Sequence, residues 1–351
     1  MNQMLRTMAR YIPAIDRLVT QRNEAVAAKW EAIRKLEEAE QARWDALKKL
    51  EDAEQAGFSV AGATAEASQV ARQPLERLEG TPYSRYAVPI EYLPSRDFRP
   101  RWGYARPPEP VLEAWFQSHQ DEYVALMREM RSSAGRLKDI PLVFDDAKLP
   151  QPAWTGVPYA PFDSVALYTM IQRARPRLYL EIGSGITTCF AWRAIADGEL
   201  PTKIMSIDPE PRARIDSICD TIVREGLETC DPAIFDQLQA GDILFFDGSH
   251  RSFMNSDVTV FMIDVLPRLK PGVIVHIHDI MLPYDYPDSF KTWYWNEQYL
   301  LAIYLMGNRQ RIRPLLPTAF ICRDPAFEAE HTTPMIDLGA ANDGWRGGGA
   351  M

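Results

Sequence analysis

The sequence predicts an α/β fold: a mostly parallel sheet with helices on both faces, preceded by a long N-terminal helix. Two observations predict the sheet. From residue 178 onward, short apolar stretches alternate with amphipathic helical ones, which is the pattern of strand–helix–strand crossovers. The first of these strands runs directly into Gly183-Ser184-Gly185. Such a turn lets the backbone approach a ligand closely, while the N-terminus of the next helix supplies amide donors.

The N-terminal helix is predicted from an internal repeat. The stretch AKWEAIRKLEEAEQ (28–41) is followed directly by ARWDALKKLEDAEQ (42–55), so the repeat is two heptads long. Alanine recurs at every seventh position, at Ala25, Ala32, Ala39, Ala46 and Ala53. Because an alanine-rich seam needs a partner to bury it, residues 1–56 are predicted to form a coiled coil that makes the chain a homo-oligomer. A single solvated helix is the alternative.

Three further segments follow this helix. Residues 57–110 are predicted to be a linker and an irregular, lid-like segment, because small polar residues give way to aromatics, prolines and arginines. Residues 111–330 are predicted to form the α/β domain, with a helical extension at its start. Residues 331–351 end in GWRGGGAM and are predicted to be a disordered tail.

The elements of the α/β domain follow from hydrophobic periodicity. Strands are predicted at 178–183, 203–208, 221–227, 242–247, 272–279 and 311–316. Helices are predicted at 111–130, 161–176, 187–197, 210–218, 232–239, 253–269 and 292–306.

Composition restricts the class of protein. Among 351 residues, 39 are Lys or Arg and 48 are Asp or Glu, giving a formal charge of -9. This balance argues against a general nucleic-acid binder, which would need a basic excess to neutralise phosphates. The four cysteines lack metal-ligand spacing and are too few to staple a chain of this length, so a cytoplasmic protein is expected. No apolar run approaches the roughly 18–20 residues of a membrane helix, and no transmembrane segment is predicted.

Acidic residues accompany the glycine turn. Glu181 stands on the first strand just before Gly183, and Thr187 or Thr188 can cap the helix that follows. Asp208 ends the second strand, where a carboxylate can bind the hydroxyls of a nucleoside ribose. A dinucleotide-binding fingerprint would have a third glycine at the position of Thr188.

Two later strands also end in polar residues. The stretch DILFFDGSH carries Asp247 and His250, and GVIVHIHD ends in His278 and Asp279. Because ligands bind outside the carboxyl ends of parallel strands, we expect all of these side chains to converge on one edge of the sheet. His276 lies deeper in its strand and is predicted to be a hydrogen-bonded core residue.

These motifs resemble those of class I S-adenosylmethionine-dependent methyltransferases, which have a Rossmann-like sheet. The D-G-S-H motif, LPRLKPGVIVHIHD and LPYDYP…WNEQYLL resemble the branch of macrocin O-methyltransferase and related bacterial sugar O-methyltransferases. The resemblance covers roughly residues 160–305. It implies that S-adenosylmethionine is bound by Glu181, Gly183, Ser184, Gly185, Thr187, Asp208 and Asp247.

The resemblance further implies methyl transfer to a hydroxyl of a saccharide or a glycosylated metabolite, a small-molecule or glycan acceptor. Such a hydroxyl needs a general base or a metal. His250 or His278 is the candidate base, and Asp247 and Asp279 could orient it or bind Mg²⁺ or another divalent metal. Where metal-dependent relatives have an Asp-Asn or Asp-Asp pair, this chain has His278-Asp279. An acceptor pocket is predicted around Tyr284, Tyr286, Trp295 and Asn296, with Glu297 beside Asn296. Trp293 and the helix with Leu300-Leu301 could equally belong to the core.

Two other functions fit parts of the sequence. A nicotinamide-dependent oxidoreductase is disfavoured by the missing third glycine and by the absence of a Tyr-x-x-x-Lys proton relay. A catalytically inactive methyltransferase-like scaffold would fit the coiled coil. The joint presence of Glu181, Asp208, Asp247 and Asp279 argues against it.

Overall fold

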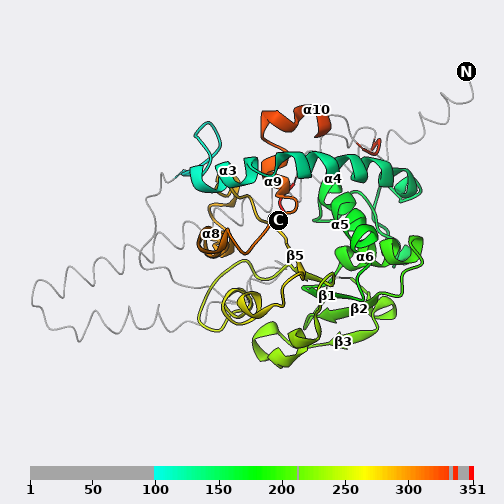
Figure 1. The fold of residues 1–351 in the computed structure, drawn as a ribbon. Helices are drawn as coiled ribbons and strands as arrows, with labels where there is room; N and C mark the ends of the chain where they lie inside the picture. Colours follow the sequence, from blue (N-terminus) through cyan, green and yellow to red (C-terminus); the bar gives the residue numbers. More distant parts are fainter. Residues whose placement is uncertain (1–98, 212, 332–334, 339–347) are drawn as a thin grey trace, which may run out of the picture. The chain divides into compact units, whose positions relative to one another are not determined.

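The chain divides into two units, Met1–Arg96 and Asp97–Met351. The computed structural model describes residues 99–211, 213–331, 335–338 and 348–351 (Figure 1). The coiled coil predicted for residues 1–56 and most of the predicted linker lie outside the described residues, so the homo-oligomer stays a prediction. Among the described residues, no helix is both long and apolar enough to cross a membrane.

A five-stranded sheet forms the centre of the described unit. All its strand pairs are parallel, and the strand order is β3-β2-β1-β4-β5. The strands are β1 (Leu178–Ile182), β2 (Lys203–Ile207), β3 (Thr221–Val223), β4 (Ile243–Phe246) and β5 (Ile274–Ile277). Every residue of the central strand β1 is buried, as expected where both faces of a parallel sheet are covered. The predicted Rossmann-like sheet is therefore confirmed.

Helices connect and cover the strands (Figure 1). Helix α6 begins at Ile186, immediately after the glycine turn, and packs against α5. Helix α5 in turn contacts α4. The helices are α3 (Pro110–Gln117), α4 (Gln120–Ser133), α5 (Pro161–Ala174), α6 (Ile186–Asp197), α7 (Asp257–Val260), α8 (Glu297–Asn308), α9 (Thr318–Ile321) and α10 (Glu328–His331).

Several predicted connections differ from the structure. The helices predicted at 210–218 and 232–239 are short 3₁₀ turns, at Asp216–Ile218 and Pro232–Gln237. The helix predicted at 253–269 divides into α7, a π-helical turn and a final 3₁₀ turn that contains Pro267. Proline lacks a backbone N–H and cannot continue a regular helix. The segment 311–316 forms no strand, and its Pro314 could not donate to a ladder.

The terminal residues pair with the end of β5 and beyond it through an isolated antiparallel bridge between His278 and Ala350. The Met351 N–H donates to the carbonyl of Ile277 over 3.0 Å, and the Ile277 N–H donates back over 2.8 Å. The Gly349 N–H donates to Asp163 Oδ2 in α5 over 3.0 Å. The prediction of a disordered tail over 331–351 is therefore wrong for Gly349, Ala350 and Met351, because their backbone groups are paired.

Candidate active site

The glycine turn brings two strands into close backbone contact. Gly183 has a φ of +79°, and a Cβ atom there would lie only 1.8 Å from the carbonyl oxygen of Asp247. Backbone hydrogen bonds flank this contact: the Gly183 N–H donates to the Ile207 carbonyl, and the Asp247 N–H donates to the Ile182 carbonyl. Only glycine combines the left-handed φ with the missing side chain, so the sequence Glu-Ile-Gly-Ser-Gly fixes the end of β4 against the end of β1.

Asp208 is held at the end of β2 by backbone donors. Its Oδ2 accepts the Ser184 N–H over 2.7 Å, and its Oδ1 accepts the Glu210 N–H over 2.7 Å. The Ser184 hydroxyl lies 2.8 Å from that of Ser206. The carboxylate therefore has a fixed orientation beside the glycine turn, as a group that binds ribose hydroxyls requires.

Glu181 lies beneath the turn. Its carboxyl group is fully buried and accepts a hydrogen bond from the Thr187 hydroxyl. Burial raises the pKa of Glu181 to about 8, even though hydrogen bonds from Thr187 and Thr188 lower it. Glu181 thus orients Thr187 from below and does not itself line the cavity described next.

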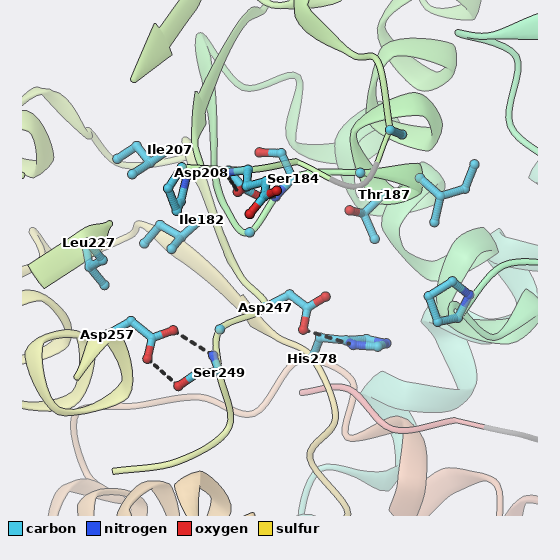
Figure 2. Close-up of a pocket in the computed structure, with 18 of the residues that line it drawn as sticks. Ile182, Ser184, Thr187, Ile207, Asp208, Leu227, Asp247, Ser249, Asp257 and His278 are labelled. Carbon is cyan, nitrogen blue, oxygen red and sulfur yellow. Dashed lines mark hydrogen bonds and ion pairs between the residues drawn. The ribbon is translucent and has the colours of Figure 1, made fainter. Parts of the chain in front are cut away.

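A cavity of about 650 Å³ opens over the carboxyl ends of β1, β2 and β4. Its size is in the range of small-ligand sites. Figure 2 shows the Ser184–Asp208 hydrogen bond at this cavity and, elsewhere in its lining, the bonds of Asp257 to Ser249. Of the residues predicted to bind the cofactor, those that line it are Gly183, Ser184, Gly185, Thr187, Asp208 and Asp247.

Asp247, His250 and Asp279 form a compact group beside this cavity. Each offers one ligand atom, and these atoms all lie within 4.8 Å of one another. His250 Nε2 is 3.6 Å from both Asp247 Oδ1 and Asp279 Oδ2. His278 Nδ1 lies 3.6 Å from Asp247 Oδ1 and 3.4 Å from Asp279 Oδ2. The structure therefore brings together all four residues that the sequence predicts for chemistry.

The electrostatics of this group favour charged imidazoles. Burial lowers the pKa of His278, but Asp279 and Asp247 raise it more, to well above the ordinary value of 6.5. His250 behaves alike: burial lowers its pKa, and Glu297, Asp247 and Asp279 raise it above that value. Carboxylates thus stabilise positive charge between them.

His276 lies apart from this group and packs in the core, as the sequence predicts, but its buried Nε2 has no hydrogen-bond partner among the described residues. Its ring stacks on Phe245 with 4.4 Å between centroids, and burial lowers its pKa to about 3. His276 is therefore a neutral core residue.

The four residues predicted to bind the acceptor are divided between two places. The ring of Trp295 lies 3.9 Å from that of His250, and Tyr286 lies 5.9 Å from Trp295. Tyr284 instead packs beneath Arg323. Asn296 uses its side-chain oxygen to accept the Ser252 N–H over 2.7 Å, so this oxygen holds a loop.

Acids that were not predicted as site residues include Asp257, which lines the cavity, and the buried Asp163. Asp257 accepts the N–H and the hydroxyl of Ser249, each over 2.6 Å. Asp163 is buried in α5, and burial raises its pKa to about 6. Its position within the apolar stretch PFDSVALY was a usable signal, because a carboxylate on a buried helix face requires a reason. Glu297, which the sequence analysis places with Asn296 at the acceptor pocket, instead contacts His250.

Replacing Gly183 by alanine tests the backbone approach. Because the new Cβ would clash with Asp247 and the φ is left-handed, we expect Gly183→Ala to lower the free energy of unfolding by about 3 kcal/mol or more. Gly185→Ala is the matched control, since its φ is 178° and no atom lies within 4 Å of the new Cβ. Urea unfolding measures both variants, and equal losses would contradict the proposed constraint.

The raised pKa of Glu181 predicts a pH-dependent stability. Between the ordinary value of 4.5 and about 8, the folded chain keeps this proton and the unfolded chain loses it. The stabilisation is therefore complete below about pH 4.5 and is lost as the pH rises through 8. We expect Glu181→Gln to flatten the profile by on the order of 1 kcal/mol per pH unit in this window. Urea unfolding from pH 5 to about 9 measures the free energy of unfolding, with Glu225→Gln at an exposed position as the control. Parallel stability profiles of the wild type and Glu181→Gln would contradict the prediction.

A comparison with known families agrees with this geometry. Residues 180–280 match the model of a family described as a methyltransferase domain. A comparison of the chain with curated proteins gave no match. The matched range begins within β1, ends just beyond β5 and contains the glycine turn, Asp208, Asp247 and Asp279. The family match and the parallel five-stranded sheet together support an S-adenosylmethionine-dependent methyltransferase.

Proposed function

We propose that the chain is an S-adenosylmethionine-dependent O-methyltransferase that acts on a hydroxyl of a saccharide or a glycosylated metabolite. The observation that carries the proposal is that Asp247 belongs to two parts of the site at once. It lines the cavity over the glycine turn and also belongs to the group with His250 and Asp279. A donor bound in that cavity would therefore lie beside ionisable groups able to handle the proton of an acceptor.

The cofactor supplies an activated methyl group, so the chain must bind it and orient the acceptor. Gly183 to Gly185 would let the backbone approach the cofactor closely. Asp208 would accept hydrogen bonds from the ribose hydroxyls, since its orientation is already fixed by two backbone donors. The glycine turn and Asp208 together fit a cofactor that has a nucleoside at one end and a charged group at the other.

A saccharide hydroxyl has a high pKa, so its proton must be removed as the methyl group arrives. We assign this step to His250. Its ring is held by Trp295 on one face and by Glu297 at Nδ1, while Nε2 points toward Asp247 and Asp279. A proton taken up at Nε2 would be stabilised by those two carboxylates.

The same group also fits a divalent cation. Two carboxylates and an imidazole nitrogen lie close enough to share one ion. Among the described residues, buried His278 Nδ1 has no hydrogen-bond partner although it faces two acids. Carboxylate oxygens suit Mg²⁺, whereas an imidazole ligand favours a transition metal. Asp247 and Asp279 would hold the ion, which would lower the pKa of a bound hydroxyl.

Aromatic side chains beside His250 support a saccharide acceptor. Trp293, Trp295 and Phe290 pack with ring centroids between 4.2 and 5.0 Å apart. Trp293 is 42% exposed, which leaves an aromatic face available to a sugar ring. The acidic net charge also fits a neutral acceptor better than a polyanion.

Cofactor binding is the first test. We expect S-adenosylhomocysteine to bind, and Asp208→Ala to weaken it about 10- to 100-fold because a charged acceptor is lost. Titration calorimetry measures both. Asp264→Ala, which removes a half-exposed acid paired with Arg268, is the control and should bind like the wild type.

The competing activity and the acceptor are tested in the same preparation. Tight binding of a nicotinamide dinucleotide without S-adenosylhomocysteine binding would refute the assignment. With labelled S-adenosylmethionine and a panel of neutral saccharides, the label should appear in an alkali-stable methyl ether. Transfer only to amines or carboxylates would refute the hydroxyl acceptor.

Metal binding is tested separately from methyl transfer. We expect Mn²⁺ to bind to the protein, and Asp279→Asn to weaken that binding about tenfold or more because a ligand charge is lost. Electron paramagnetic resonance of free Mn²⁺ measures the affinity, with Asp264→Asn as the control. Equal affinities in the wild type and Asp279→Asn would remove the metal from the proposal.

A further inference from the structure

Three consecutive residues before and at the start of α8 hold the loop that carries His250. The Asn296 N–H donates to the His250 carbonyl over 2.9 Å, and the Asn296 side chain accepts the Ser252 N–H. The Trp295 ring lies over the imidazole, 3.9 Å between centroids and tilted by 32°. The loop backbone and the ring are thus fixed by different residues.

Glu297 provides the third contact. Its Oε1 lies 2.5 Å from His250 Nδ1, and the residue has no exposed surface. Burial raises the pKa of Glu297 to about 7, and the contact with His250 lowers it in part. No donor among the described residues reaches its other carboxylate oxygen, Oε2. The His250 imidazole is therefore the principal hydrogen-bond partner of the buried Glu297 carboxylate.

The backbone at His250 is strained. Its φ is +63°, in the left-handed region that residues other than glycine adopt at a cost of about 1 kcal/mol or more. Such a conformation persists only where the surroundings hold it. Here Asn296 binds the carbonyl of the strained residue, and Glu297 binds its ring.

We infer that Glu297 is a positioning residue that binds the Nδ1–H of His250 and so leaves Nε2 as the unprotonated nitrogen of the neutral ring. This inference rests on the proposed function, in which Nε2 receives the acceptor proton. A neutral imidazole carries one proton, on either nitrogen. Above its pKa of about 7, Glu297 is a carboxylate that can only accept, so the nitrogen bound to it keeps that proton.

Without Glu297, the other tautomer would be favoured. Asp247 and Asp279 both face Nε2 at 3.6 Å. If Nδ1 had no acceptor, these two carboxylates would draw the ring proton to Nε2. That nitrogen would then be a donor and could neither remove a proton from an acceptor nor bind a cation. Glu297 therefore counteracts the attraction of Asp247 and Asp279 for the His250 ring proton.

The tautomer can be measured without knowing the acceptor. We propose ¹⁵N NMR of the full-length protein labelled at its five histidines, with chelator and S-adenosylhomocysteine present, at the alkaline plateau of the His250 signals. The signals are assigned with His250→Gln. Wild type should show a protonated Nδ1 and an unprotonated Nε2. In Glu297→Leu the proton should move to Nε2.

Two variants separate the carboxylate from general packing. Glu297→Gln keeps an acceptor oxygen and should keep the wild-type tautomer. Asn296→Ala removes the side-chain contact with Ser252 but keeps the backbone N–H that binds the His250 carbonyl, and it should also keep the wild-type tautomer. A wild-type spectrum with the proton on Nε2 would overturn the inference, even if Glu297→Leu fails to fold. So would the same tautomer in wild type and Glu297→Leu, or a shift to Nε2 in Asn296→Ala.

The result is distinguishable from a failure of the proposed function. Calorimetry with S-adenosylhomocysteine reports on the cofactor cavity, which Glu297 does not line. We expect the affinity of Glu297→Leu to stay within about twofold of wild type. Loss of binding in the wild type would refute the methyltransferase, while the tautomer would still be read from the His250 signals.

Discussion

The close approach of Gly183 to the carbonyl of Asp247 determines where every other part of the site can lie. A Cβ atom at position 183 would overlap the Asp247 oxygen, so the two strand ends meet only because one side chain is absent. The contact places the first residue after β4 beside the turn after β1. Asp247 consequently faces the cavity and the histidines at once, and the site is assembled from neighbouring strand ends without a long loop.

Charge balance is the second condition for this site. Asp247, Asp279 and Glu297 lie around two imidazoles in a largely buried volume. Burial alone would neutralise the acids, as it does for Glu181, whose pKa rises to about 8. The histidines respond in the opposite sense, with raised pKa values, because the acids stabilise their positive form. A divalent cation would compensate the charge of the same carboxylates. The preference for charged imidazoles and the fit to a cation therefore have the same electrostatic cause.

The strands and the residues at their ends could be predicted from sequence because two local rules suffice. Apolar runs mark β1, β2, β4 and β5, and parallel strands place their carboxyl ends on one edge. The connections were predicted less well, since prolines such as Pro267 divide helices that hydrophobic spacing alone would continue. The pairing of residues 349–351 with the end of β5 and beyond it was missed because a glycine-rich stretch carries no hydrophobic pattern.

The orientation of His250 shows why a motif does not determine its chemistry. The sequence Asp-Gly-Ser-His places an imidazole at the strand end, but either ring nitrogen could carry its proton. The partner that selects one is 47 residues away, at the start of α8. It meets the ring at a residue whose φ is left-handed and whose carbonyl accepts the Asn296 N–H. Hydrophobic periodicity cannot report such a contact, since Glu297 reads as an ordinary acidic residue in a first helical turn. By the inference above, the same motif with a residue at position 297 that offers Nδ1 no acceptor would present a donor at Nε2 where this chain presents an acceptor.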